Sequence, residues 1–286
     1  MWLGTDKVFE AFKFYVAQTP YGVMQVHGYP FDDKGSTFIV EMNEEVWRAA
    51  GFDSFAAQEL APGESDEKSI ERVRELFGDV LDGHEVMANN SKWINFATVR
   101  NEHWRHDNIV LLGDAAHTAH FSIGSGTKLA MEDALALAAT LYEHDSVDVA
   151  LDEYETERKA VVLSTQRAAQ ASLEWFENLG QYVDQDPLQF AFNIMTRSRR
   201  VTYDNLRLRD PEFVTRINEW FARQQGPDAE LDAPPMFQPY RLGELELVNR
   251  VVVSPMDMYR AVDGVPNLFH HVHLGGKALG GAGLVM

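Results

Sequence analysis

A strand–loop–helix pattern in the middle of the chain constrains the fold more than any other feature. A short apolar run, Ile109–Leu112, leads into Gly113 and Asp114, as in a parallel strand that is buried on both faces. A loop with two glycines follows at 122–126, and residues 127–144 have an uninterrupted helical pattern. The apolar stripe expected on this helix consists of Ala130, Ala134, Leu137, Ala138 and Leu141. The pattern predicts an α/β fold in which a ligand binds beyond the carboxyl end of the strand.

The residue types in this pattern suit a flat ligand that carries hydroxyl groups. Asp114 is an acceptor at the expected strand end, where it could bind ligand hydroxyls. Gly124 and Gly126 allow the backbone to approach a planar group closely, and the free N–H groups of the helix start favour negative charge. The simpler interpretation is an Asp cap and a glycine turn between two core elements. The glycine pair Gly124 and Gly126 and the following Glu132-Asp133 favour the ligand site over this interpretation. We expect one of the two acids to support the loop and the other to be solvated, because adjacent helix positions point in different directions.

The first hundred residues predict a mixed antiparallel sheet with a few helices. A hairpin is expected over 12–29 around the turn at 19–22, and a strand over 37–41. Asn43 is the expected N-cap of a helix whose first turn is acidic. Further expected elements are a helix at 69–76, a strand at 93–99, and helices at 149–182, 187–199 and 211–225.

The last sixty residues have a different character. Residues 226–234 are rich in proline and acids without an apolar period, which predicts an exposed linker. Beyond it, a strand at 249–255, a helix at 266–279 and a second strand at 282–286 form a βαβ pattern.

Composition excludes several classes of function. The chain has 25 Lys and Arg against 44 Asp and Glu, a net charge of −19, which disfavours nucleic-acid binding. No cysteine is present, so disulfides, thiolate metal sites and thiol catalysis are excluded. No apolar run approaches the roughly 20 residues of a membrane span, and no secretory signal is visible. We therefore expect a cytoplasmic protein that binds neither membranes nor nucleic acid.

Residues 108–141 resemble the second flavin-binding motif of the group A flavoprotein aromatic monooxygenases, the family typified by para-hydroxybenzoate hydroxylase. The resemblance implies that the acid contacts the ribityl and ribose part of FAD, while the loop and helix start hold its ring. The implied FAD contacts are Gly113, Asp114, Gly124, Ser125, Gly126 and Thr127. Residues 1–107 resemble the substrate-covering sheet of this family, above all in salicylyl-CoA and anthraniloyl-CoA (2-aminobenzoyl-CoA) hydroxylases. The proline usual after the His of the motif is absent here, and no Gly-x-Gly-x-x-Gly precedes Asp114.

The C-terminal segment resembles the opening of old yellow enzyme, an FMN-binding TIM barrel. The similarity lies in Asn249–Met256 and Gly280–Leu284. It implies FMN contacts at Ser254, Pro255, Met256 and Asp257, and places Tyr259 on the substrate side. Residues 235–286 number 52, whereas a barrel needs about 250, so we expect an internal fragment of a longer protein.

Together these resemblances imply an α/β (α+β) chain: the C-terminal part of a para-hydroxybenzoate hydroxylase-like FAD fold, followed by the first βα unit of a TIM barrel. The expected domains are 1–107 (substrate-covering sheet), 108–225 (second FAD motif and helices), 226–234 (linker) and 235–286 (barrel start). The implied function is that of a bifunctional flavoprotein that hydroxylates an aromatic acyl-CoA with FAD, O₂ and NAD(P)H and has an FMN half. The alternatives are a stand-alone phenol-type hydroxylase and a non-catalytic α/β ligand-binding module. Catalytic residues are not identified, and a homo-oligomer is compatible with the sequence.

Other constellations are weaker. His117 with His120, and the cluster of His270, His271 and His273, lack a convincing further metal ligand, so no metal site is predicted. Ser122, Ser125 and His117 do not have the spacing of a hydrolase nucleophile elbow. Four aromatic residues are candidates for a substrate pocket, although core packing is their commoner use: Trp2, Trp93, Phe96 and Trp104.

Overall fold

The computed structural model describes residues 1–56, 60–226 and 229–286. These form two compact units, Met1–Arg200 and Val201–Met286, which are described separately below. The predicted linker 226–234 includes residues 227–228, which lie outside the described residues. Among the described residues, no helix has both the length and the apolar character needed to cross a bilayer.

The first unit contains a five-stranded antiparallel sheet with the order β2-β3-β4-β1-β5. Its strands are β1 (Trp2–Thr5), β2 (Lys13–Thr19), β3 (Gly22–Pro30), β4 (Ser36–Glu41) and β5 (Val86–Met87). The predicted hairpin is confirmed, because β2 and β3 pair from Lys13↔Gly28 to Thr19↔Gly22. The predicted strand over 37–41 is confirmed as β4.

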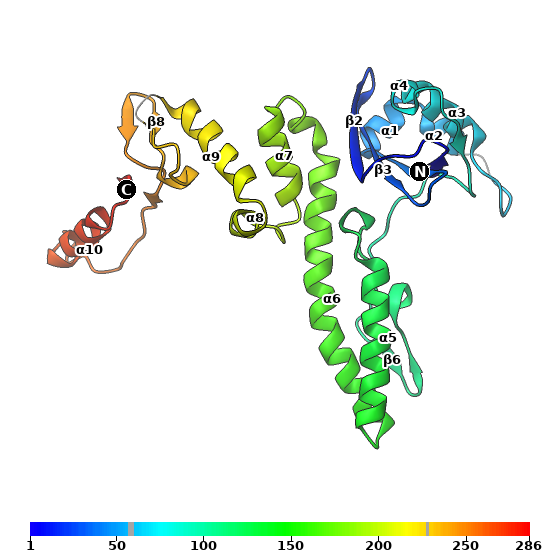
Figure 1. Cartoon of the computed structure of the whole chain (residues 1–286). Coiled ribbons are helices and arrows are strands. Elements are labelled where there is room, and N and C mark those ends of the chain that lie inside the picture. The colour runs from blue at the N-terminus through cyan, green and yellow to red at the C-terminus, as the bar shows by residue number, and fades with distance from the viewer. Residues whose placement is uncertain (57–59, 227–228) are drawn as a thin grey trace. The chain divides into compact units, whose positions relative to one another are not determined.

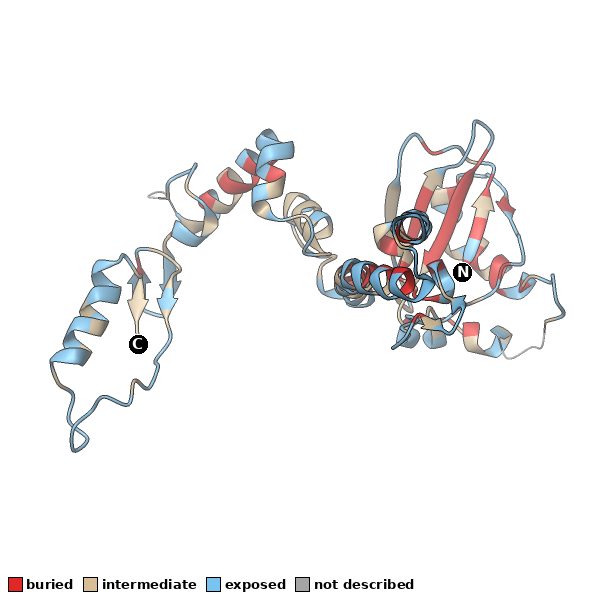
Figure 2. Cartoon of the chain, turned by 90° about the horizontal axis from the view of Figure 1, so that it is seen from below, coloured by how far each residue is buried: buried red, intermediate tan, exposed pale blue. Residues whose placement is uncertain are grey.

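The pleat of this sheet separates two sets of side chains. Even-numbered residues of β3 and β4, such as Met24, Val26 and Phe38, are buried in the hydrophobic core. Each such side chain contributes roughly 1.5–3 kcal/mol through its burial, so this face holds the sheet in place. Odd-numbered residues, including His27 and Ile39, face the opposite side, where a cavity lies. Figure 2 shows buried residues concentrated in the sheet.

Four short helices supply the other half of this core (Figure 1). They are α1 (Glu44–Ala49), α2 (Phe52–Ala56), α3 (Glu67–Leu76) and α4 (Gly78–Leu81). The predicted cap is confirmed, because the Asn43 side chain accepts a hydrogen bond from the N–H of Val46 at 2.9 Å. The predicted helix over 69–76 is confirmed as α3, which begins two residues earlier after the cap Asp66.

Three longer helices complete the first unit: α5 (Gly126–Glu143), α6 (Val147–Glu177) and α7 (Pro187–Thr196). Helices α5 and α6 lie side by side (Figure 1). The predicted apolar stripe of α5 is wrong, since Ala134, Ala138 and Leu141 are exposed. The buried residues of α5 are instead Leu129, Asp133 and Thr140. The helix is rotated because Asp133 is drawn inward by polar partners that are described below.

Two predicted strands do not form as expected among the described residues. Residues 108–114 were expected to form a parallel strand buried on both faces, but only β7 (Ile109–Val110) forms, and it pairs antiparallel with β6 (Arg105–His106). Ile109 is 64% exposed. An apolar run becomes a buried parallel strand only beside parallel neighbours, and β6 is the sole partner of β7 among the described strands. Residues 93–99 likewise find no strand to pair with and run as irregular chain.

The second unit contains two helices followed by small strand pairs. Helix α8 (Tyr203–Arg209), which was not predicted, packs on α9 (Pro211–Gln225), and β8 (Tyr240–Leu242) pairs with β9 (Leu245–Leu247). The predicted βαβ pattern is confirmed: β10 (Val252–Val253) and β11 (Leu284–Val285) are parallel and are joined through α10 (Leu268–Leu279). Most residues beyond 240 are exposed or half-buried (Figure 2).

Candidate active site

A cavity of about 930 Å³ in the first unit lies between the sheet and the loop that precedes α5. The face of the sheet toward this cavity is the one that carries the odd-numbered residues of β3 and β4. The sheet contributes mainly aromatic side chains, Phe14, His27 and Tyr29, together with Ile39, and Phe12 joins them from just before β2. The loop contributes Asp114 and the segment 122–127. A cavity of this size with apolar walls and a few polar groups is typical of a small-molecule or cofactor site.

Five of the six residues that were predicted to contact FAD line this cavity: Asp114, Gly124, Ser125, Gly126 and Thr127. Gly113 does not, because it lies behind Asp114 at the start of a 3₁₀ turn, η1 (Gly113–Ala115). Asp114 therefore stands on this turn rather than at a strand end. Its carboxylate is exposed and makes no hydrogen bond with any described residue, so both oxygens are free to accept from a ligand.

The start of α5 offers further groups to a ligand. The Ser125 side chain does not cap the helix, so the first N–H groups of α5 have no side-chain partner. Gly124 is left-handed with φ +62°, which favours glycine. Gly126 has no such requirement, and no atom of the described chain lies within 4 Å of where its Cβ would stand. The protein's own packing does not demand glycine at 126, whereas a flat group lying against the backbone would. These residues fit a flavin.

A buried carboxylate holds this loop from behind. Asp133 of α5 has no exposed surface and accepts hydrogen bonds from the N–H of Gly113 (3.0 Å), from Nε2 of His117 (2.7 Å) and from Nε of Arg158 (2.9 Å). The adjacent Glu132 is partly exposed and binds Lys128 and Arg158. The prediction that one of the two acids supports the loop is confirmed for Asp133.

A second polar cluster lies on the sheet face of the site. Glu41 accepts from Nε2 of His27 (2.8 Å), from Nε2 of Gln25 (2.7 Å) and from Nε2 of His120 (3.2 Å). Burial raises the pKa of Glu41, but the hydrogen bonds from His120 and His27, together with the positive charges these rings carry when protonated, outweigh it and lower the pKa to about 2. Glu41 is therefore a buried carboxylate at neutral pH.

Arg197 closes the cavity from the end of α7. Its guanidinium lies over the rings of Phe14 and Phe176, at 5.2 and 4.9 Å from their centroids. It donates from Nε to Oγ of Ser172 (2.9 Å) and from Nη2 to the carbonyl of Ser122 (2.8 Å). Burial lowers the pKa of Arg197, while the charge of Glu41 acts in the opposite direction. Among the described residues no acid forms a salt bridge with Arg197, so its positive charge is available to a ligand.

The structure also places the residues of the weaker candidates, which are the metal site, the hydrolase site and the aromatic pocket. His117 binds Asp133 and His120 binds Glu41, and in the described part of the chain no group of three acids or histidines is arranged to hold a metal ion. Ser122 hydrogen-bonds His120 rather than His117, so the three residues of the hydrolase alternative do not meet. Of the four aromatic candidates, Trp2 and Phe96 line the large cavity, Trp93 lines a neighbouring cavity of about 320 Å³, and Trp104 is core.

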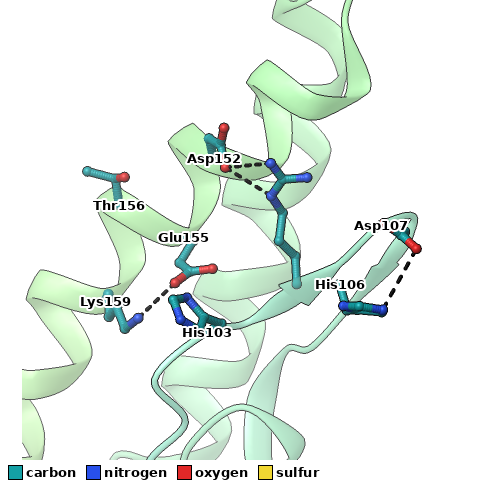
Figure 3. Close-up of a pocket in the computed structure, with 8 residues that line it drawn as sticks. His103, His106, Asp107, Asp152, Glu155, Thr156 and Lys159 are labelled. Carbon is teal, nitrogen blue, oxygen red and sulfur yellow. Dashed lines mark hydrogen bonds and ion pairs between the residues drawn. The ribbon is translucent and has the colours of Figure 1, made fainter.

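A third pocket, of about 670 Å³, lies between the β6–β7 hairpin and α6 (Figure 3). Its charged groups are already bonded to each other. Arg105 binds Asp152 (2.8 Å) and Asp148 (3.1 Å), and Lys159 binds Glu155 (2.7 Å). Since its cations are neutralised by neighbouring acids, this pocket has less to offer a ligand than the cavity at Asp114.

His27, Glu41 and Arg197 were not found by sequence reasoning. A signal for two of them exists: Gln25, His27 and Glu41 are polar residues at odd positions of strands whose even positions are mostly apolar. Arg197 carries no comparable local signal.

The residues that were predicted to contact FMN lie in the second unit. Ser254, Pro255, Met256 and Asp257 follow β10 as exposed chain, and Tyr259 is 89% exposed. Asp257 accepts a hydrogen bond from the N–H of Tyr259 at 2.9 Å. An exposed turn of this kind is not in itself a flavin cradle.

Residues 10–169 match the family described as FAD binding domain, a range that includes Asp114, the glycine loop and α5. The chain therefore belongs to the FAD-binding domain family. It is 44% identical over 268 residues to a salicyloyl-CoA 5-hydroxylase from a Streptomyces species. The aligned region covers 92% of this chain and 50% of that protein. It is 38% identical over 179 residues to the 3-hydroxy-4-methyl-anthranilyl-(aryl-carrier protein) 5-monooxygenase of Streptosporangium sibiricum, covering 63% of this chain and 45% of that protein.

Among solved structures, PqsL from Pseudomonas aeruginosa matches with 22% sequence identity and a TM-score of 0.44, covering 62% of this chain and 48% of that one. The chain spans about half the length of the curated relatives it matches.

Proposed function

We propose that the protein is part of an FAD-dependent monooxygenase that hydroxylates an aromatic acyl thioester of the salicyloyl-CoA type, using O₂ and NAD(P)H. The observation that carries the proposal is the cavity whose two walls are Asp114 with the glycine loop on one side and the aromatic face of the sheet on the other. The names of the two relatives support an aromatic substrate bound as a thioester or carrier-bound acyl group.

In this proposal Asp114 accepts hydrogen bonds from the ribityl hydroxyls of FAD, and 124–127 lie against its ring. Bound FAD, once reduced by NAD(P)H, would supply the activation of O₂ for oxygen transfer to the substrate ring. The N–H groups at the start of α5 would stabilise negative charge beside them. The aromatic wall around Phe14 and Tyr29 would pack on the substrate and exclude water from the reacting atoms.

We further propose the domain division expected from the sequence: a substrate-covering sheet over 1–107, the second FAD motif with its helices over 108–225, a linker at 226–234, and the opening of an FMN-binding barrel over 235–286. Support for the last comes from the parallel β10–α10–β11 unit and from the 92% of the chain that aligns with the salicyloyl-CoA 5-hydroxylase, a share that reaches past residue 226. Ser254–Asp257 would face FMN and Tyr259 the substrate of that half.

Asp114→Ala tests the flavin assignment in the natural full-length protein. Loss of hydrogen bonds to a charged group is expected to raise the Kd for FAD by about 10- to 100-fold, measured by quenching of flavin fluorescence. The matched control is Glu143→Ala, which removes an exposed carboxylate from the far end of α5 and should leave the Kd unchanged. Equal affinity in the two variants would show that Asp114 does not hold the flavin. Conversion of salicyloyl-CoA to a product heavier by one oxygen, followed by mass spectrometry, tests the reaction itself.

A further inference from the structure

His27 and Glu41 form a buried pair on the cavity face of the sheet. Gln25 lies directly opposite Glu41 in the β3–β4 register, and His27 is the diagonal neighbour on the same face. The His27 ring is fixed by three aromatic neighbours, with centroid distances of 5.0 Å to Phe14, 5.3 Å to Phe121 and 5.2 Å to Phe176. Its Nε2 reaches Glu41 at 2.8 Å. The imidazole therefore has one orientation, set by packing and by a carboxylate.

The donor and the acceptor can be assigned for each hydrogen bond that leads from Arg197 to His120. Arg197 can only donate, so Oγ of Ser172 accepts from its Nε. Oγ of Ser172 and Oγ of Ser122 are 2.8 Å apart, and Oγ of Ser122 is 2.8 Å from Nδ1 of His120. The backbone N–H of Ser122 also points at this Nδ1, which marks it as an acceptor. Each hydroxyl then donates toward His120, whose Nε2–H donates to Glu41.

His27 has the same arrangement at Glu41. Glu41 is ionised and can only accept, so Nε2 of His27 carries the proton of their hydrogen bond. In a neutral imidazole the other nitrogen, Nδ1, is then an acceptor. Nδ1 of His27 makes no hydrogen bond with any residue that the structure describes, while His27 lines the cavity. His27, which lines the cavity where the proposed substrate binds, thus carries a ring nitrogen that has no hydrogen-bond partner among the described residues.

We propose that His27 is the base that takes the proton from the ring hydroxyl of the aromatic substrate, and that Glu41 is the positioning residue that orients it. This inference rests on the proposed function. In the step, the substrate O–H bond breaks, its electron pair stays on oxygen, and the proton forms an N–H bond at Nδ1 of His27. No oxidant or further reactant is needed. The phenolate that results has a more electron-rich ring than the phenol and is the better acceptor of an electrophilic oxygen atom.

The surrounding charges favour this step. The imidazolium would lie against the Glu41 carboxylate, whose oxygen is 2.8 Å from Nε2, and this opposite charge would stabilise it. The new phenolate would share the cavity with Arg197, whose cation has no acidic salt-bridge partner among the described residues. Asp114 lines the same cavity on the loop wall, and His120 faces Glu41 from the other side.

The test uses the natural full-length protein with FAD and salicyloyl-CoA, without NAD(P)H, so that the ligand binds and is not consumed. The absorbance of the bound ligand distinguishes phenol from phenolate across a pH titration. We expect the wild-type protein to bind the phenolate at a pH at which free salicyloyl-CoA is still protonated. His27→Gln should bind the neutral phenol and, with NAD(P)H and O₂ present, lose roughly 100- to 10,000-fold in kcat with little change in KM. Glu41→Gln should shift the ionisation of the bound ligand toward that of the free ligand.

His106→Gln is the matched control, because His106 is 89% exposed and lies outside the cavity. It should behave as the wild type. A His27→Gln protein that keeps both the phenolate band and kcat would overturn the assignment, and so would a wild-type protein that binds the neutral phenol. If His27→Gln does not fold, the Glu41→Gln titration decides the question: a bound ligand that ionises as in the wild type would overturn the assignment. If the wild type hydroxylates salicyloyl-CoA but fails these tests, only the assignment of His27 as the base is wrong. If the wild type neither binds nor hydroxylates salicyloyl-CoA, both the proposed function and the base assignment fail.

Discussion

Removing the Asp133 carboxylate should destabilise the first unit more than any other single change to a side chain at the loop. In Asp133→Ala, Arg158 keeps its contact with Glu132 at 3.1 Å but loses its buried partner, and it is only 6% exposed. Breaking a buried ion pair costs about 3–5 kcal/mol. The N–H of Gly113 and Nε2 of His117 also lose their acceptor, at about 1–3 kcal/mol each when they stay buried. These costs are not additive and the remaining Glu132 contact offsets part of them, so we expect a loss of about 4 kcal/mol.

Equilibrium denaturation in urea measures this loss. Trp104 is a suitable reporter, because its ring lies 5.1 Å from that of His117 and is buried with Tyr154. The control is Glu132→Ala, the adjacent acid, which also binds Arg158 but is partly exposed and should cost less than about 1 kcal/mol. If the two variants unfold at the same urea concentration, the Asp133 carboxylate does not support the loop.

Two further predictions concern Glu41 and Gly113. The pKa of Glu41 in the folded protein, about 2, lies below its ordinary 4.5, so the charged carboxylate contributes stability above pH 4.5 that is lost as the pH falls through 2. The stability advantage of the wild type over Glu41→Gln should therefore shrink by roughly 3 kcal/mol between pH 5 and pH 2 in acid denaturation; an advantage independent of pH would contradict the ion pairing. Gly113→Ala should cost more than the roughly 1–2 kcal/mol of a left-handed alanine, because its Cβ would lie 3.2 Å from that of Ala130. Gly124→Ala, equally left-handed but in open space, should cost only the backbone part in thermal unfolding, and equal losses would show that the Ala130 contact is harmless.

The elements that the sequence predicted correctly are those with local causes. The β2–β3 hairpin follows from a turn between two β-rich stretches, and the Asn43 cap from one side chain and the acids after it. The parallel β10–β11 pair follows from a complete strand–helix–strand pattern. In the same way, Asp114 and 124–127 are close in sequence, so spacing alone brought them to one wall of the cavity.

The elements that the sequence predicted wrongly depend on distant partners. Residues 108–114 have the composition of a buried strand, but β7 has only β6 beside it among the described strands. The stripe on α5 was placed one residue too far along because Asp133 is buried by Gly113, His117 and Arg158, none of which a helical period reveals. The cluster of His27, Glu41 and His120 joins β3, β4 and a loop far away in the chain, and only the fold brings it together.

The alternation of side chains along β3 and β4 has a consequence for how such a protein can change. Tyr29 and Ile39 face the cavity, whereas Met24, Val26 and Phe38 fill the opposite side. Since neighbouring residues have separate roles, substitutions on one side of the strands can fit the cavity to a ligand of different shape while leaving the hydrophobic packing intact. Specificity and folding are thereby free to evolve at adjacent codons with little interference between them.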